Sequence, residues 1–140
     1  MVPRVATATV LGALAVLHAA WGRGSTFPFA EPAELSDAVV GRPGQAPPPA
    51  AACFAVGGAL AVAALVAADL PIAPRGLRRR AATVLTGVLA LRGALGLTGH
   101  TNVLSPGSVS PRFRRNDRRI YAPLCLALAA GTASTLLRRR

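Results

Sequence analysis

The sequence predicts an all-α membrane protein in which four transmembrane helices form an up-down bundle and a short interfacial helix lies in the first connection. Three observations predict this fold class. Four apolar runs are each about 17–20 residues long, the length that crosses a hydrocarbon core of about 30 Å at about 1.5 Å per residue. Apolar residues make up 52% of the chain, and the mean hydropathy is +0.45. Most of the basic residues flank the runs, as they do where membrane helices meet lipid headgroups.

The four predicted spans cover residues 5–22, 51–70, 81–98 and 121–137 of a single membrane domain. Backbone N–H and C=O groups find no water in the hydrocarbon core, so each span must satisfy them internally as a helix. Small residues at four-residue spacing, such as Gly57 with Ala61 and Ala8 with Gly12, favour close helix packing. The alternative, that an alanine-rich composition scatters small residues everywhere, stays open.

The connections between the spans differ in character. The first contains "EPAELSDAVVG", where Pro32 suits a first helical turn and Leu35 and Val39 share a face, and this pattern predicts the short interfacial helix. "GRPGQAPPPA" follows as a stiff, extended linker. The second connection, "PIAPRGLRRR", is short and strongly basic. The third ends in "PRFRRNDRRIY", where five arginines and one aspartate precede the fourth apolar run.

An even number of spans places both termini on the same side of the membrane, together with the connection at residues 75–80. That side carries eight arginines and the opposite side seven, so the positive-inside rule gives only a small bias. We predict cytoplasmic N- and C-termini, because the rule weighs short basic loops most and the first connection carries three carboxylates.

The net charge of +11 comes from arginine, since the chain contains no lysine. A strongly basic chain often binds nucleic acid. Here the arginines border apolar runs, so we expect no nucleic-acid partner. The expected partner is the lipid bilayer, including its anionic headgroups, whose phosphates suit adjacent arginines. The sequence leaves the oligomeric state unknown.

Alternating spans bring most polar or reactive side chains near the spans to one end of the bundle. We predict a polar cluster there, made of His18, Trp21, Arg92, Asp117, Tyr121 and Cys125. Cys53 and His100 lie at the same end, and whether Cys53 and Cys125 are bonded stays open.

Arg92 is the most informative member of this cluster, since it lies about 9 Å from the end of its span. A charge at the bilayer centre costs about 2.5–3.5 kcal/mol on insertion scales. A partner carboxylate lowers that cost, and Asp117 is the best-placed partner. Two further roles stay open for Arg92, a snorkelling side chain that orders a loop and a ligand-binding side chain.

No zinc-ligand spacing, phosphate loop or nucleophile elbow occurs in the sequence. We therefore predict no metal ion and no cofactor, and no residue can be assigned a catalytic role.

Several of these motifs together resemble a known family. "LHAAWGRGSTFPF" with "ELSDAVVG", then "ALRGALG" and "RFRRNDRRIYAPLCL", resemble the small bacterial integral membrane proteins catalogued as domain of unknown function 3995. The resemblance covers roughly residues 11–128 and implies four spans in a bacterial cell (inner) membrane. Its implied motif positions are His18, Trp21, Gly24, Arg92, Asp117, Tyr121, Pro123 and Cys125. The resemblance implies no activity.

Two functional hypotheses follow. In the first, the chain is a non-enzymatic membrane protein whose arginine–aspartate block is a structural clasp that contacts lipid or a partner. In the second, it is a small membrane enzyme or transporter with a pocket lined by His18, Arg92, Asp117 and Tyr121, in which His and Asp exchange protons and Arg92 holds an anion. The sequence does not separate them.

Overall fold

The structure, a computed structural model that describes residues 2–137, confirms the all-α fold. Within these residues every regular element is helical. The long helices are α1 (Val2–Gly22), α3 (Ala50–Ala68), α4 (Arg75–Thr98), and a continuous helix made of α5 (Pro111–Asn116), η3 (Asp117–Tyr121) and α6 (Ala122–Leu137). All four are long and apolar enough to cross a membrane.

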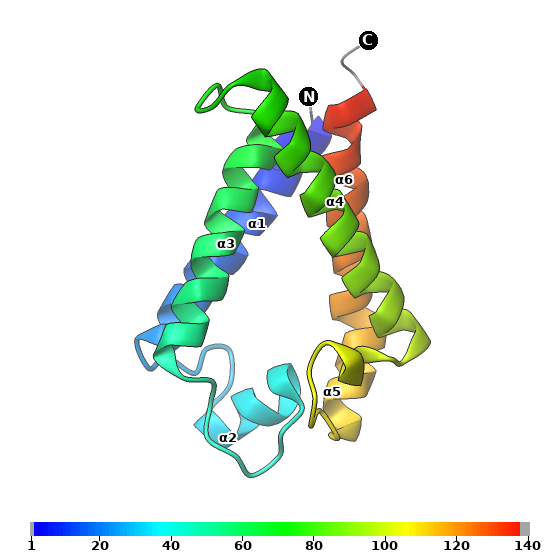
Figure 1. The fold of residues 1–140 in the computed structure, drawn as a ribbon. Helices are drawn as coiled ribbons and strands as arrows, with labels where there is room; N and C mark the ends of the chain where they lie inside the picture. The colour runs from blue at the N-terminus through cyan, green and yellow to red at the C-terminus, as the bar shows by residue number, and fades with distance from the viewer. Residues whose placement is uncertain (1, 138–140) are drawn as a thin grey trace.

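Consecutive long helices run in opposite directions and form two pairs (Figure 1). α1 packs along α3, and α4 packs along α6. The two pairs meet where α1 begins and α6 ends, which we call the narrow end, and they diverge toward the opposite, wide end. The predicted up-down bundle is therefore present, with the shape of two inclined helical pairs.

The short helix expected in the first connection is also present. It consists of α2 (Pro32–Leu35), with proline in its first turn, and the π-helical turn η1 (Ser36–Val40). It lies at the wide end, where it packs against α5 across the space between the pairs (Figure 1). A further short turn, η2 (Thr101–Val103), follows α4.

Two long helices begin well before their apolar runs. α4 begins at Arg75, so most of the basic second connection is helical. The fourth long helix begins at Pro111, where the Ser110 hydroxyl caps the first turn by accepting from the Phe113 N–H at 3.2 Å. Arginine is a good helix former, so these charged turns extend the helices beyond the part that hydropathy detects.

Small side chains mediate the packing within and between the pairs. A Cβ atom on Gly57 of α3 would lie 3.2 Å from the Ala15 carbonyl of α1, which shows how closely these helices approach. The shared core draws on all four long helices and consists of Leu11, Ala63, Ala67, Leu89, Leu128 and Ala129.

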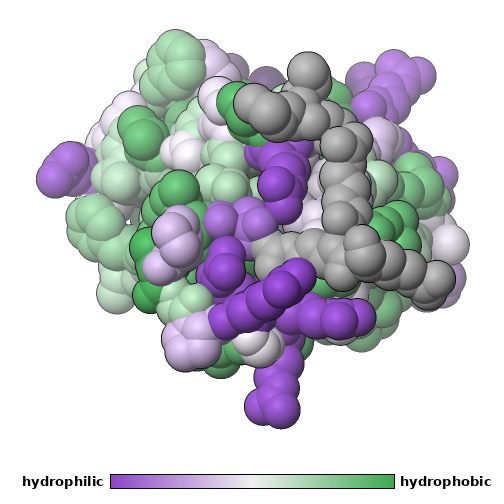
Figure 2. Space-filling view, turned by 90° about the horizontal axis from the view of Figure 1, so that it is seen from above, coloured by the Kyte–Doolittle hydropathy of each residue, from purple (hydrophilic) through white to green (hydrophobic). Residues whose placement is uncertain are grey.

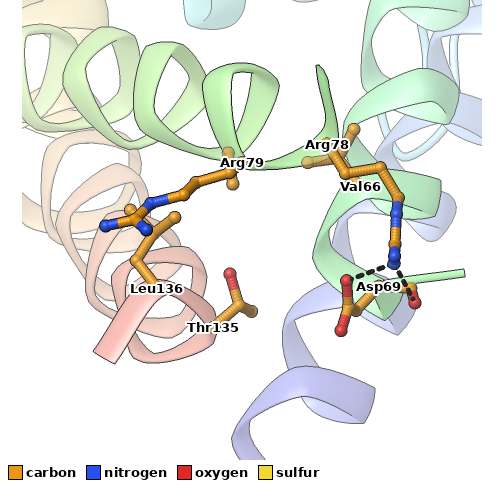
Figure 3. A pocket seen from close by; sticks show the side chains of 7 residues that line it. Val66, Asp69, Arg78, Arg79, Thr135 and Leu136 are labelled. Carbon is orange, nitrogen blue, oxygen red and sulfur yellow. Dashed lines mark hydrogen bonds and ion pairs between the residues drawn. The ribbon is translucent and has the colours of Figure 1, made fainter. Parts of the chain in front are cut away.

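A single carboxylate joins three helices at the narrow end. Asp69, which ends α3, pairs with Arg4 of α1 at 2.8 Å and with Arg78 of α4 at 2.7 Å. Figure 3 shows Arg78 extended toward Asp69, while Arg79 extends away from it toward Leu136. The hollow between them holds about 10 Å³, roughly the space of one water molecule. From above this end, hydrophilic side chains lie near the centre and project at the margins of the view, with hydrophobic areas mainly on either side (Figure 2).

Candidate functional site

The wide end is organised around a buried carboxylate. Asp117 begins η3 and its side chain is only 1% exposed. Arg92 of α4 donates from Nη2 to Asp117 Oδ1 at 2.6 Å, and the hydroxyl of buried Thr101 donates to Oδ2. The ion pair expected between Arg92 and Asp117 is therefore present. A buried carboxylate needs such partners, because removing it from water without them costs several kcal/mol.

Glycines in α4 create the space for this pair. A Cβ atom on Gly96 would lie 2.8 Å from Arg92 Nη1, 3.0 Å from Asp117 Oδ2 and 2.7 Å from the Ala122 Cβ atom. On Gly93 it would lie 2.6 Å from the Leu126 Cγ atom. The "ALRGALG" segment thus provides the cation, Arg92. It also provides two glycines, whose lack of a side chain lets α4 approach the fourth long helix.

The first connection is docked onto the fourth long helix through backbone carbonyls. The Tyr121 hydroxyl donates to the Ala38 carbonyl at 3.0 Å, and Asn116 Nδ2 donates to the same oxygen at 3.4 Å. Ser108 Oγ donates to the Val40 carbonyl at 2.7 Å. These bonds satisfy carbonyls at the end of η1 and connect the two helical pairs.

Gly41 lies at the centre of this docked region. Its φ of 81° is left-handed, and a Cβ atom there would lie 2.9 Å from the ring of Phe113. Its carbonyl accepts from the Val109 and Ser110 N–H groups at 3.0 and 3.1 Å. Only glycine fits both the backbone conformation and the space.

A charged contact lies at the edge of the same region. Arg112 Nη1 lies 3.9 Å from Asp37 Oδ2, and the Arg112 guanidinium lies 5.7 Å from the centre of the Phe29 ring. Arg112 is 46% exposed, so this pair contributes much less than the buried pair at Asp117.

The remaining four arginines of the block form a separate surface, which we call the arginine face. Arg114, Arg115, Arg118 and Arg119 line, together with Pro111, an open hollow of about 440 Å³. All four are exposed. In the described part of the chain, no ion pair or side-chain hydrogen bond joins any of them to an acceptor.

The structure divides the predicted polar cluster between the two helical pairs. Arg92, Asp117, Tyr121 and Cys125 belong to the α4–α6 pair, where Arg92 and Asp117 are in contact. His18 and Trp21 belong to α1. Among residues 2–137, no hydrogen bond, ion pair or ring contact joins these two to Arg92, Asp117 or Tyr121.

His18 and Trp21 make their polar contacts at the end of α1 and just beyond it. His18 Nδ1 lies 2.8 Å from the Leu14 carbonyl, and its ring packs against Trp21 with centroids 4.8 Å apart. Trp21 Nε1 donates to the Phe27 carbonyl at 2.7 Å. Trp21 thus orders the chain that leaves the helix, and His18 packs against its ring.

The cysteines are not bonded to each other. Cys53 is buried near the start of α3, with its Sγ atom 3.8 Å from the Pro48 carbonyl. Cys125 is half-buried in α6, and both are free thiols. Across the described residues, no three His, Cys, Asp or Glu side chains come together as a metal site would require.

Sequence reasoning missed several residues that build this end. They are Thr101, Ser108, Ser110, Phe113, Asn116 and, at the narrow end, Asp69. One signal was available for part of this set, since Ser110 followed by Pro111 is a helix-start pattern. The contacts of Thr101 and Asn116 depend on how connections fold back, which periodicity does not report.

The fold and this site define a class of protein: a small all-helical chain with four candidate membrane-spanning helices and a buried arginine–carboxylate pair at one end. Within that class, residues 11–132 match the family described as "Protein of unknown function (DUF3995)", and the chain belongs to this family. Neither the curated proteins nor the solved structures contain a match to the chain.

Proposed function

We propose that the protein is a non-enzymatic, lipid-binding component of a bacterial cell (inner) membrane, whose arginine face holds anionic headgroups. One observation carries this proposal. Four neighbouring arginines line one open hollow with no acidic partner, whereas the block's other arginine, Arg112, and the intramembrane Arg92 each approach a carboxylate. Unpaired guanidinium groups at the end of a membrane helix are well suited to bind lipid phosphates.

The position of the arginine face along its helix supports a lipid contact. Arg119 and Arg114 lie about 3 and 10 Å along the helix axis from Tyr121, where the fourth apolar run begins. The polar layer on each side of a bilayer is about 5–8 Å thick. The arginines therefore fall in and just beyond the headgroup layer when the apolar run fills the hydrocarbon core.

In this proposal the buried pair is a structural clasp. Arg92 and Asp117 connect α4 to the start of the fourth long helix, and Tyr121 connects that helix to the first connection. Both contacts hold the turns that carry the arginine face in one orientation. His18, Trp21 and Cys125 are structural in this proposal, the first two through their contacts at the end of α1.

Lipid binding can be measured on the purified full-length chain in detergent by native mass spectrometry, with phosphatidylglycerol and phosphatidylcholine as probes. We expect at least tenfold tighter binding of phosphatidylglycerol. Changing Arg114, Arg115, Arg118 and Arg119 together to Gln should remove that preference. A control for loss of surface charge elsewhere is Arg75→Gln/Arg80→Gln, at two exposed positions of α4 at the narrow end. A preference that persists in the fourfold variant excludes the arginine face as the binding surface.

A further inference from the structure

We infer that the arginine face recognises a lipid whose headgroup carries two phosphate groups, in preference to lipids with one. This inference rests on the proposed function and names the class of ligand for the same surface. Four properties of the hollow carry it: its charge, the spacing of its arginines, its size and the ordered backbone that carries them.

Charge complementarity favours two phosphates. The hollow is lined by four guanidinium groups and by no carboxylate. Each guanidinium can donate two parallel hydrogen bonds to a phosphate. A single phosphodiester brings one negative charge, so it leaves most of the hollow's positive charge unbalanced. Two phosphates provide one acceptor group for each pair of arginines.

The spacing of the arginines also favours a ligand with two phosphates. Arg114 with Arg118, and Arg115 with Arg119, are separated by four residues on one helix. Like charges at that spacing repel each other. Within the described residues, Asp117 is the nearest carboxylate in sequence, and it is buried against Arg92 and Thr101. An external anion can relieve these repulsive pairs further, and two phosphates relieve both pairs at once.

The hollow has room for such a headgroup. Its volume of about 440 Å³ falls within the range of about 300–1,000 Å³ that is usual for small-molecule sites. Exposed apolar residues continue from it along the helix toward the hydrocarbon core, at Ile120, Pro123, Ala127 and Ala130. This arrangement places acyl chains beside the helix and favours a membrane lipid over a soluble phosphate compound.

The arginines are presented by a rigid backbone. Ser110 caps the first turn of α5, and Asp117 anchors the middle of the block through its buried contacts. A Cβ atom on Gly99 would lie 2.6 Å from Arg118 Nη2, so this guanidinium lies against the end of α4. An ordered backbone lowers the entropy cost of binding, so that only the exposed arginine side chains have to be ordered by the ligand.

The test compares cardiolipin, which carries two phosphates, with phosphatidylglycerol, which carries one, by native mass spectrometry of the full-length protein in detergent. We expect the dissociation constant for cardiolipin to be at least tenfold lower. The double variant Arg115→Gln/Arg119→Gln should reduce that ratio to about threefold or less. The double variant Arg114→Gln/Arg118→Gln should do the same, and a thermal unfolding curve shows whether each variant is folded. Arg75→Gln/Arg80→Gln is the matched control and should preserve the ratio.

Each other result overturns a defined part of the inference. If both lipids bind equally tightly and the arginine-face variants lose this binding, the preference for two phosphates is wrong. The proposed function is then still supported. If no arginine-face variant changes lipid binding, both proposals are wrong. Inorganic pyrophosphate that binds as tightly as cardiolipin, and displaces it completely, overturns the assignment of the ligand to the membrane.

Discussion

Asp117 and Asp37 are two carboxylates of the wide end that differ mainly in burial. Asp117 is 1% exposed and contacts Arg92 at 2.6 Å, whereas Asp37 is 25% exposed and Arg112 lies 3.9 Å away. Removing one partner of a buried pair leaves an uncompensated charge, while an exposed pair exchanges its contact for water. The same chemical change at the two positions therefore separates a structural clasp from a surface contact.

Asp117→Asn is the first prediction. It should lower the free energy of unfolding in detergent by about 3 kcal/mol or more, because the Arg92 charge stays half-buried without a counterion. Asp37→Asn, the matched change, should cost about 1 kcal/mol or less. Thermal and denaturant unfolding of the purified variants measures both values.

A double-mutant cycle then tests whether Arg92 and Asp117 act together. Arg92→Leu alone should also destabilise the protein, and Arg92→Leu/Asp117→Asn should cost clearly less than the sum of the single changes. Strictly additive effects would mean that the two side chains do not stabilise each other. The proposed structural role of the Arg92–Asp117 pair would then be wrong.

At the scale of elements, the approach of α4 to the fourth long helix depends on missing side chains. Gly96→Ala should destabilise the protein by about 1–3 kcal/mol, because the added methyl group overlaps the Ala122 Cβ atom and the buried pair. Gly87→Ala in the same helix meets nothing within 4 Å and should be neutral or stabilising by up to about 1 kcal/mol. Equal unfolding temperatures for the two variants would contradict this packing.

The docking of the first connection gives a second pair of matched glycines. Gly41 and Gly44 both have left-handed backbone conformations, with φ of 81° and 70°. Alanine costs about 1–2 kcal/mol in such a conformation. Gly44→Ala adds only that strain, since nothing lies within 4 Å, while Gly41→Ala also meets Phe113.

We therefore expect Gly41→Ala to be the more destabilising variant and to increase proteolysis of the linker at residues 42–49. Proteolysis of Gly44→Ala should stay close to that of the unmodified chain. If both variants are cleaved equally fast, the close contact between Gly41 and Phe113 is not what holds the connection in place.

These elements also show what the sequence can and cannot predict. Four apolar runs and the pattern around Pro32 were sufficient for the fold class, because lipid exposure imposes a strong periodic and compositional signal. The true starts of α4 and of the helix at Pro111 were not visible, since arginine-rich turns carry no hydropathy signal. The Arg92–Asp117 contact was predictable from the side of Arg92, because few carboxylates lie at a similar depth and Asp117 is the best placed of them.

The docked connection was beyond prediction for a different reason. Its acceptors are the backbone carbonyls of Ala38, Val40 and Gly41, and every residue carries a carbonyl. Similarly, the division of the predicted polar cluster follows from the divergence of the two helical pairs (Figure 1), a property of the packing between helices that alternation of spans does not specify.

For the whole molecule, the remaining question is its direction across the membrane, and we propose cytoplasmic termini. The narrow end carries Arg4, Arg75, Arg78, Arg79 and Arg80, of which Arg4 and Arg78 share Asp69. The wide end carries more acidic residues, including Glu31, Glu34 and Asp37. Short basic connections weigh most in the positive-inside rule, so the α3–α4 connection favours the cytoplasm for the narrow end.

Reporter fusions provide the last prediction. A fusion after Arg140 should give a cytoplasmic signal, and one near Gly44, in the linker after η1, should give an extracytoplasmic signal, because three candidate spans, α3, α4 and the fourth long helix, lie between the two positions. The opposite pair of signals would invert the orientation and place the arginine face in the cytoplasmic leaflet. Two signals on the same side would show that α3, α4 and the fourth long helix do not all cross the membrane. A further fusion between Ala73 and Arg75 serves as the control, since it should match the fusion after Arg140 whenever α4 and the fourth long helix both cross the membrane.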